Sequence, residues 1–527
     1  MVRSIFLANA LFSARRFDLD LDAEFINAAF DHASTTLPSF EVSPKRPWIS
    51  QKTLDLISKR GVARREGNYT VEKQVNREVR ASAKADRKAF LEAELAGGSW
   101  KSIQRLRKGP GKKYTGIKNP EGTLVDLSER AETLAEYFEK VQWEICFANL
   151  TPIRSTPIND CSNIPEYDFS EADLSRVLQK LKIGKVGGHD DIPPEFWKYV
   201  SDDIGACLQL LELCNHCWRS KTLPQAWKTA KVILLFKKGD SCLPQNYRPI
   251  ALLPVGYKVL ASLVHQRLLD SGIDDLVWPS QYGFLPKRGC ADALMLIRRM
   301  VDAAYDANNG GIGMVFLDWA KAFDRIRSDS LLHALTKFGF PLHVVNMIGA
   351  IYESRSFYIS DHSGNSRERV QAAGIAQGCP LSPFLFIIVQ SVMFHDIYER
   401  VNLDPKPENV VLRELLYADD TVLISRGQDN LQRLLHEVVT EGAKYGLELN
   451  WSKTYQMNVC SNIEIYCPGG AQLEIVRTFV YLGGLITCDG RCDGVLNRKL
   501  GEGRGIFKSL CQIWSHASIS QQRKRDF

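Results

Sequence analysis

The sequence predicts an α+β fold built around an antiparallel β-hairpin, and three observations lead to this prediction. Two adjacent carboxylates, Asp419 and Asp420, stand between two apolar runs that are rich in branched residues. Another apolar run ends in a third carboxylate, Asp318. Runs with the period of amphipathic helices lie before, between and after these strands. Because a hairpin joins antiparallel strands, we expect an antiparallel sheet that is covered by helices.

The hairpin explains how two neighbouring carboxylates can act at one place. Val410–Leu416 and Thr421–Ile424 have the composition of strands. Consecutive side chains of a strand point to opposite faces, whereas a tight turn holds them near one locus. Charge beside such apolar flanks is costly unless a cation neutralises it, and carboxylates are ligands of Mg²⁺. Taken alone, the pair also fits a solvated turn, in which Asp is common.

The totals describe an ordinary globular protein that is long enough for two or three domains. The chain has 527 residues, 45% hydrophobic and 24% charged, with a formal charge of +6 and a pI of about 8.5. This balance is compatible with nucleic acid without requiring it. No apolar run is long enough to cross a membrane. Scattered cysteines indicate an intracellular protein, nuclear or cytoplasmic rather than secreted. Cys214 and Cys217 form a CxxC in a helical pattern, where we expect core packing rather than zinc.

The N-terminal part is predicted to be helical and basic. Val71–Ala96 is a helical pattern dense in both signs of charge, which is typical of a solvated helix with ion pairs. The following stretch, 101–113, carries six Lys and Arg residues around Gly109-Pro110-Gly111. Such a composition suits contact with a phosphate backbone. Thr151–Glu166 is rich in Pro, Ser and Asn and is the predicted linker.

The remaining elements follow in order after this linker. Ser170 is expected to cap a helix that runs to Leu181, and Ala230–Phe236 is a buried strand that ends at Lys237 and Lys238. A turn-rich loop at 374–383 precedes an apolar helix. Further helical patterns cover residues 204–218, 258–269, 291–304, 384–399 and 430–445, and 479–484 is a strand and turn.

The three carboxylates and the surrounding cations predict a chemistry. Carboxylates from two strands are a common means of holding two divalent ions, one for an attacking hydroxyl and one for the leaving oxygen. Cations suited to phosphates stand nearby in the predicted fold: Lys237, Lys238, Arg248 and Lys453. Such an assembly suits phosphoryl or nucleotidyl transfer. Each Lys or Arg, taken singly, is nearly as well explained as a solvated surface charge.

In their order and spacing, these motifs resemble the reverse transcriptases of non-LTR (LINE-type) retrotransposons, over roughly residues 170–515. FLDWAKAFDRI, GIAQGCPLSPFLF, LLYADDTVLI, GLELNWSK and FVYLGG resemble the five palm motifs. LLFKKGD, NYRPIALL and QYGFLPKRGC resemble the fingers and the segment that follows them. PWIS and the charged helix resemble the connector of such elements. Ala376 departs from the pattern, because the family usually has Arg before this Gln.

The resemblance implies roles for individual residues. Asp318, Asp419 and Asp420 would hold Mg²⁺, with Mn²⁺ as the alternative, and Asp318 and Asp419 would be the direct ligands. Lys453 would approach the triphosphate and is a candidate proton donor to pyrophosphate. The expected nucleotide-binding residues are Lys237, Arg248, the steric gate Phe323, Gln377 and Gly378. The residues expected near the primer are Tyr417, Ala418, Tyr481, Leu482 and Gly483. Phe323 is also explicable as a core aromatic at a strand–helix junction.

The resemblance also implies an architecture and partners. We expect a right-hand polymerase, with an antiparallel sheet in the palm and a mainly helical N-terminal region. The expected parts are a basic connector at 1–150, a linker at 151–168, fingers and palm at 169–475, and a primer-grip hairpin with a partial thumb at 476–527. The partners would be an RNA template, a DNA primer or target, and dNTPs, with no membrane.

The expected activity is RNA-directed DNA polymerisation. The sequence shows no endonuclease region, and we expect a part of a larger polyprotein. An inactive or truncated relic that binds RNA without polymerising is the main alternative. A metal-dependent nuclease that uses the same carboxylates is a second one, although no His or Glu partners typical of nucleases accompany them.

Overall fold

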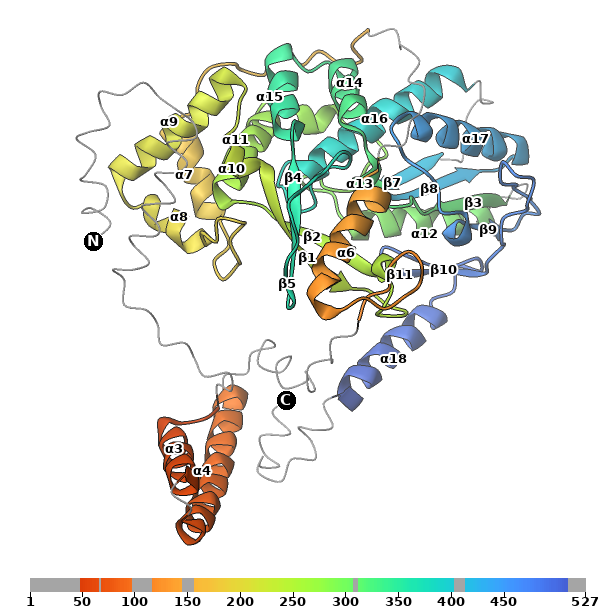
Figure 1. Cartoon of the computed structure of the whole chain (residues 1–527). Helices are drawn as coiled ribbons and strands as arrows, with labels where there is room; N and C mark the ends of the chain where they lie inside the picture. The colour runs from red at the N-terminus through yellow and green to blue at the C-terminus, as the bar shows by residue number, and fades with distance from the viewer. Residues whose placement is uncertain are drawn as a thin grey trace. The chain divides into compact units, whose positions relative to one another are not determined.

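The computed structural model describes residues 48–65, 68–96, 116–144, 156–306, 311–401 and 413–509. The described residues form two compact units (Figure 1). The larger unit takes in residues 116–492, and the smaller one contains residues 48–96 and 493–509. The basic stretch predicted at 101–113 lies outside the described residues. In the part of the chain that is described, no helix is long and apolar enough to cross a membrane.

A four-stranded antiparallel sheet forms the centre of the larger unit. Its strands lie in the order β7 (Glu414–Tyr417), β8 (Asp420–Ser425), β3 (Ile312–Leu317) and β9 (Tyr455–Val459). Both neighbours of β3 run antiparallel to it. The predicted α+β class with an antiparallel sheet is therefore confirmed. The sequence patterns did not predict β9, which is therefore an addition to the predicted sheet.

Every residue of β3 is buried, because the sheet is covered on both faces. Val315 and Leu317 belong to one apolar cluster, whereas Met314 and Phe316 belong to the other. This alternation is the period of two that a strand requires. The first cluster contains helices α14 (Ser328–Phe338), α16 (Ser382–Arg400) and α17 (Gln428–Lys444). The second contains α12 (Cys290–Asp306) and the hairpin β10 (Thr478–Tyr481) and β11 (Gly484–Thr487).

A second sheet with its own helices lies in the region predicted as the fingers (Figure 1). Its order is β2 (Tyr247–Leu252), β1 (Thr229–Phe236), β4 (Ser356–Asp361) and β5 (Gly364–Asn365), and β6 (Arg369–Val370) also pairs with β4. Strand β4 runs parallel to β1, although the two are far apart in sequence. The helices are α7 (Glu171–Lys180), α8 (Pro194–Val200), α9 (Ile204–Ser220), α10 (Gln225–Lys228), α11 (Val255–Asp270) and α15 (Leu342–Tyr352). Cys214 and Cys217 on α9 are fully buried, so the expectation of core packing is confirmed.

Helix α7 has the start that the sequence predicts. Ser170 accepts a hydrogen bond from the Asp173 backbone, and the Asp173 carboxylate accepts one from the Ser170 backbone. This capping box satisfies two amide groups that a helix start would otherwise leave unpaired.

The residues before the fingers also pack in the larger unit. Helix α6 (Arg130–Tyr137) continues into one π-helical turn, η3 (Phe138–Gln142). Ion pairs join it to the fingers sheet: Arg130 to Asp361 at 2.8 Å, and Glu132 to Arg369 at 2.6 Å. Residues 116–144 are therefore part of the same compact unit as the two sheets.

The smaller unit contains a helical hairpin, α3 (Gln51–Arg65) and α4 (Tyr69–Ala96), and the helix α18 (Asp493–Ser509). The charged helix predicted at 71–96 is confirmed by α4. Asp86 on α4 accepts hydrogen bonds from Ser50 and Thr53 at the start of α3. These bonds lower the pKa of Asp86, with Thr53 as the largest cause.

A buried ion pair between α14 and α16 gives the first testable prediction. Lys337 and Asp396 form it, with exposed fractions of 5% and 1%. Removing one partner of such a pair leaves an uncompensated buried charge. We expect Asp396→Asn to lower the free energy of unfolding by about 3 kcal/mol, measured by urea unfolding. The double variant Lys337→Met, Asp396→Leu should recover most of this loss, because no charge remains buried. If Asp396→Asn lowers the free energy of unfolding by less than about 1 kcal/mol, Lys337 and Asp396 do not form a stabilising buried ion pair.

Candidate active site

The Asp419 and Asp420 pair lies at the tip of the β7–β8 hairpin, as the sequence predicts. Tyr417 pairs with Asp420 across the hairpin, so that Ala418 and Asp419 form the turn. Ala418 has a φ of +53°, a left-handed value that a two-residue turn requires. Asp419 is thus in the turn itself, and Asp420 is the first residue of β8.

A neighbouring segment holds this turn in place through backbone hydrogen bonds. The amide of Tyr282 donates to the Leu416 carbonyl at 2.8 Å, and the amide of Leu416 donates to the Ser280 carbonyl at 3.0 Å. The side-chain oxygen of Gln281 accepts from the amides of Ala418 at 3.0 Å and Gly283 at 2.7 Å. Because Gln281 is fully buried, these bonds are sheltered from water.

Gly283 shows why this neighbouring segment contains a glycine. A Cβ atom at this position would lie 2.5 Å from the backbone nitrogen of Ala418. That distance is below any normal contact, so a larger residue would push the segment away from the turn. The glycine of the QYGF motif therefore permits a close approach of two backbones next to the carboxylates.

Asp318 follows directly after β3, the strand beside β8. Its carbonyl accepts a hydrogen bond from the Asn450 amide at 2.7 Å, which links it to the segment that carries Lys453. The Lys453 ammonium lies 3.3 Å from the Asp318 carboxylate, and both side chains are solvent-accessible. The geometry thus brings together residues that are widely separated in the sequence.

The three carboxylates influence one another electrostatically. The pKa of Asp420 is raised to about 6, first by burial and then by the charges of Asp419 and Asp318. The pKa of Asp419 is also raised, first by burial and then by Asp318, while Arg248 opposes the shift. Repulsion of this kind is relieved when cations bind.

Two cations from the fingers face the same region. Lys237 follows β1, and Arg248 lies on β2, opposite Leu235 of β1. Burial lowers the pKa of Lys237, as do the nearby charges of Arg248 and Lys453, whereas Asp324 and Asp318 oppose this shift. The charges of Lys237 and Arg248 from the second sheet, and of Lys453, therefore act in the same region as the carboxylates.

The donor set fits divalent cations that prefer oxygen ligands. In the described residues, one group of three or more ligating side chains has its atoms within 4.8 Å of one another: His395, Asp396 and Glu399. Its Asp396 is already paired with Lys337, so a structural role accounts for that group. The carboxylate oxygens of Asp318, Asp419 and Asp420 do not all lie within 4.8 Å of one another. The Asp318 carboxylate is paired with the Lys453 ammonium instead.

Phe323, Gln377 and Gly378 lie on the segments beside the sheet. The Phe323 ring stacks on Phe386 with centroids 4.6 Å apart and is partly exposed. The Gln377 amide nitrogen donates to Asp324 at 3.1 Å. Gly378 has a φ of +114°, and a Cβ atom there would lie 2.7 Å from the carbonyl oxygen of Ala251 on β2. The loop therefore runs close to the fingers sheet.

The residues expected at the primer are divided between two hairpins that contact each other. Tyr417 ends β7, and Tyr481 ends β10. Leu482 and Gly483 form the turn to β11 with φ values of +47° and +77°. The Tyr481 hydroxyl donates to the backbone oxygen of Asp420 at 3.5 Å, which joins the two turns.

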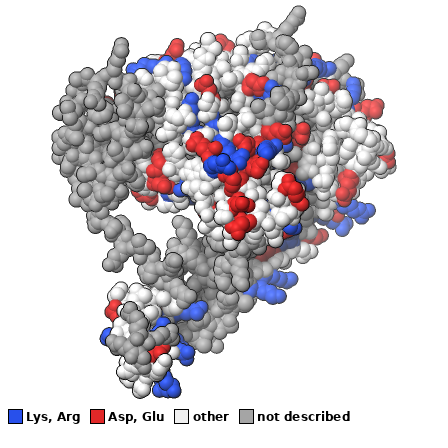
Figure 2. Space-filling model, in the orientation of Figure 1, with Lys and Arg blue, Asp and Glu red and all other residues white. Residues whose placement is uncertain are grey.

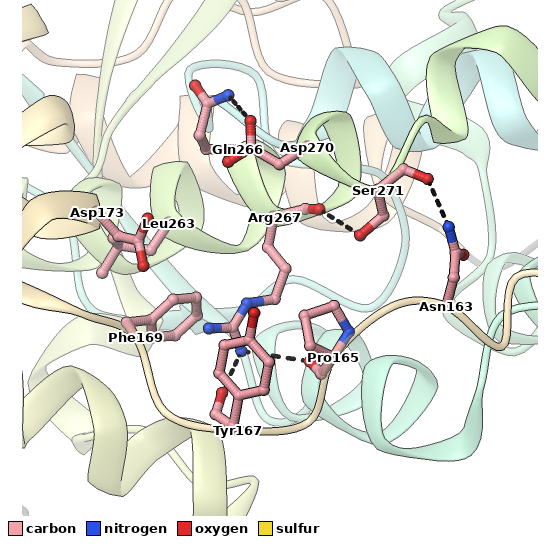
Figure 3. A pocket seen from close by; sticks show the side chains of 10 residues that line it. All are labelled: Asn163, Pro165, Tyr167, Phe169, Asp173, Leu263, Gln266, Arg267, Asp270 and Ser271. Atoms are coloured by element: carbon pink, nitrogen blue, oxygen red, sulfur yellow. Dashed lines mark hydrogen bonds between the residues drawn. The ribbon is translucent and has the colours of Figure 1, made fainter.

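A pocket of about 370 Å³ lies elsewhere, in the fingers (Figure 3). Its centre is Arg267, whose guanidinium lies 3.9 Å from the Phe169 ring centroid and donates to the carbonyl of Tyr167 at 2.6 Å. These contacts attach residues 163–169 to α11. None of the site residues predicted from the sequence lines this pocket.

Sequence reasoning missed two buried groups at the site. Gln281 holds the hairpin turn, and Asp324 receives hydrogen bonds from three side chains. Both residues stand inside motifs that the sequence analysis quoted, QYGF and AFD. Their partners come from distant parts of the chain, so spacing alone gives no sign of these bonds.

Comparison with known proteins shows which family part of this chain matches. Residues 236–486 match the reverse transcriptase (RNA-dependent DNA polymerase) family. The RNA-directed DNA polymerase from mobile element jockey of Drosophila melanogaster is 27% identical over 421 residues, which cover 74% of this chain and 43% of that protein. The probable RNA-directed DNA polymerase from transposon BS of the same organism is 24% identical, covering 80% of this chain and 47% of that protein.

Another relative is the Pol polyprotein from the type-2 retrotransposable element R2DM of Drosophila melanogaster. It is 27% identical over 343 residues, which cover 61% of this chain and 30% of that protein. The chain spans less than half the length of these relatives. Apo telomerase from Candida tropicalis is a similar solved structure, with a TM-score of 0.37 and 15% identity. The match covers 50% of this chain and 48% of that one, and these values are too low to support an inference. Residues 236–486 therefore match the reverse transcriptase family, and the chain is similar to RNA-directed DNA polymerases of non-LTR retrotransposons, as its motifs predict.

Proposed function

We propose that this chain is an RNA-directed DNA polymerase that uses Mg²⁺. One observation carries the proposal: Asp318 after β3 and the Asp419 and Asp420 turn beside it lie among the cations Lys453, Lys237 and Arg248. Carboxylates with cations around them suit a reaction in which negative charge develops on phosphate oxygens. The family match over 236–486 supports the same reaction.

The reaction is nucleotidyl transfer. The oxygen of a primer 3′-hydroxyl attacks the α-phosphorus of a dNTP, a new P–O bond forms, and the bond to the β-phosphate oxygen breaks. The hydroxyl proton leaves with solvent or a nearby base, and pyrophosphate is released. Bound divalent ions would lower the pKa of the hydroxyl and neutralise charge on the leaving pyrophosphate.

The site residues divide the remaining work. Asp318 and Asp419 are the proposed direct ligands of the ions, with Asp420 beside them. Lys453 is the proposed partner of the triphosphate and proton donor to pyrophosphate, since its ammonium already faces Asp318. Lys237 and Arg248 are proposed to hold phosphates from the fingers.

The other contacts are also part of the proposal. Phe323 is the proposed steric gate against a ribose 2′-hydroxyl. Gln377 and Gly378 are proposed to contact the nucleotide and template. The primer end is assigned to the two joined turns, with Tyr417, Tyr481, Leu482 and Gly483.

The proposed partners are an RNA template, a DNA primer or target and dNTPs, within the nucleus or cytoplasm. The proposed domain organisation is the one expected from the sequence, with a primer-grip hairpin and partial thumb after 476. Primer extension distinguishes this activity from the alternative, a relic that binds RNA without polymerising.

Primer extension on an RNA template tests the activity directly. With Mg²⁺ and dNTPs, we expect the parent chain to extend the primer and Asp419→Ala to lose at least 10³-fold of the rate, a loss of about 4 kcal/mol of transition-state stabilisation. RNA binding, measured by filter retention, serves as the control and should be unchanged. A parent chain that binds RNA but does not extend would favour the relic. Cleavage of labelled RNA or DNA without dNTPs would favour the nuclease.

Metal dependence should vary with pH through Asp420. Its pKa of about 6 means that protons compete with Mg²⁺ below that pH, so the Mg²⁺ concentration for half-saturation should rise by about tenfold per pH unit there. Asp420→Asn should flatten this dependence. Calorimetric titration with Mg²⁺ between pH 5 and 8 measures this pH dependence. If it has the same slope in the parent and in Asp420→Asn, protonation of Asp420 does not compete with Mg²⁺.

The same carboxyl group links pH to stability without metal. Its pKa is about 6 in the folded protein and 3.8 ordinarily, so between these values the folded state binds more protons than the unfolded state. The metal-free protein should therefore lose stability as pH rises from about 4 to 6 through this group. Thermal unfolding in EDTA should show the loss in the parent and a smaller one in Asp420→Asn.

Sugar selection tests Phe323. We expect Phe323→Val to raise incorporation of rNTPs relative to dNTPs by at least tenfold, because the smaller side chain leaves room for a 2′-hydroxyl. Single-nucleotide kinetics with matched rNTP and dNTP measure the ratio. Phe386→Leu, which changes the ring beneath Phe323, is the matched control and should change the ratio less. An unchanged ratio in Phe323→Val would assign Phe323 to the core alone.

A further inference from the structure

Asp324 is a buried carboxylate next to the proposed site that no step of the reaction uses. It lies on α13 (Ala322–Arg325), after Phe323, and its exposed fraction is 5%. One of its oxygens accepts from the amide nitrogens of Gln142 at 2.6 Å and Gln377 at 3.1 Å, and the other accepts from the Trp143 indole at 3.1 Å. The indole can only donate, so the carboxylate acts as an acceptor there.

Two of these three donors come from the segment that precedes the fingers. Gln142 ends η3, and Trp143 follows it, with exposed fractions of 7% and 3%. The Trp143 ring packs edge-on against Phe357 of β4 with centroids 4.4 Å apart. Both residues lie outside the stretch 236–486 that matches the reverse transcriptase family.

Ion pairs and carbonyl contacts fix this segment against the rest of the unit. Arg369 of β6 pairs with Glu132 at 2.6 Å and also with Glu139. Figure 2 shows acidic and basic side chains gathered over the region of α6 and β4. The Val141 carbonyl accepts from Lys321 at 3.4 Å and from Arg325 at 3.2 Å, on either side of Asp324 in the chain. Gln142 and Trp143 therefore reach Asp324 from a firmly held position.

We propose that Asp324 is a positioning residue that fixes the side-chain amide of Gln377 for the nucleotide, and that Gln142 and Trp143 hold it for this task. The inference rests on the proposed function, because it assumes that Gln377 faces the nucleotide. It extends the polymerase site to residues 142 and 143, ahead of the fingers.

The chemistry of the amide gives the reason. A carboxylate that accepts hydrogen bonds must face the NH₂ end of Gln377, so the carbonyl end of that amide is turned to the opposite side. An Asn at 324 would offer both a donor and an acceptor, and the amide of Gln377 could then sit in either orientation. In this variant the nucleotide would face either the carbonyl or the NH₂ end of the Gln377 amide, whereas in the parent it faces the carbonyl end.

The test compares single-nucleotide incorporation by the full chain and three variants. Asp324→Asn and Trp143→Phe, which keeps a ring against Phe357, should raise the KM for the dNTP by about tenfold and change kcat less than threefold. Trp218→Phe is the matched control, because its indole is also buried and donates a hydrogen bond, to the carbonyl of Glu166 at 2.8 Å. It should shift thermal unfolding by a similar amount and leave the KM unchanged.

Hydrogen exchange gives a readout that needs no turnover. Amides of residues 374–379 should exchange at least tenfold faster in Asp324→Asn and Trp143→Phe than in the parent, and not in Trp218→Phe. If the parent does not extend a primer, the proposed function fails, while the exchange data still decide whether Asp324 holds this loop. Equal KM values and equal exchange in all variants would overturn the inference.

Discussion

The structure depends on holding three like charges close together at one edge of a sheet. Burial raises the pKa values of Asp419 and Asp420, and repulsion among the carboxylates adds to the same shift. Backbone hydrogen bonds of the four-stranded sheet set their places. The segment 280–283 adds hydrogen bonds to the hairpin, from its backbone and from the side chain of Gln281. A cation is the natural partner of such a strained arrangement of charge.

The rest of the larger unit keeps this edge in place. Strand β3 is buried along its whole length, so sliding it by one residue would move its apolar side chains to the wrong clusters. The helix layer contains ion pairs with very low exposure, among them Lys337 with Asp396, and Lys444 with Glu441 at 2.7 Å. Leaving one such charge unpaired is costly, which restricts how these helices can be arranged.

The sequence predicted the elements whose signal is local. The hairpin turn, β3 with Asp318, and the apolar helix α16 all follow from short apolar runs and their ends. Strand β9 was missed because its polar residues include Gln456, which is fully buried, and Asn458. Strand β4 was missed because its pairing with β1 joins residues more than a hundred positions apart. The hydrogen bonds of Gln281 and Asp324 also join residues that are far apart in the chain, so the spacing of residues in the sequence does not indicate them.

The departure at Ala376 shows how packing changes the meaning of a motif. The family pattern places Arg there, and a missing cation would suggest a weakened loop. In the structure Ala376 is buried, and Arg355, with an exposed fraction of 6%, supports the loop instead. Its guanidinium donates to the Gly374 carbonyl at 3.0 Å and to the Gln371 side chain at 2.8 Å. The loop that carries Gln377 is thus tied to a buried arginine from just before β4, on one side, and to Asp324 on the other. Loss of the motif arginine therefore does not by itself argue for a decayed site.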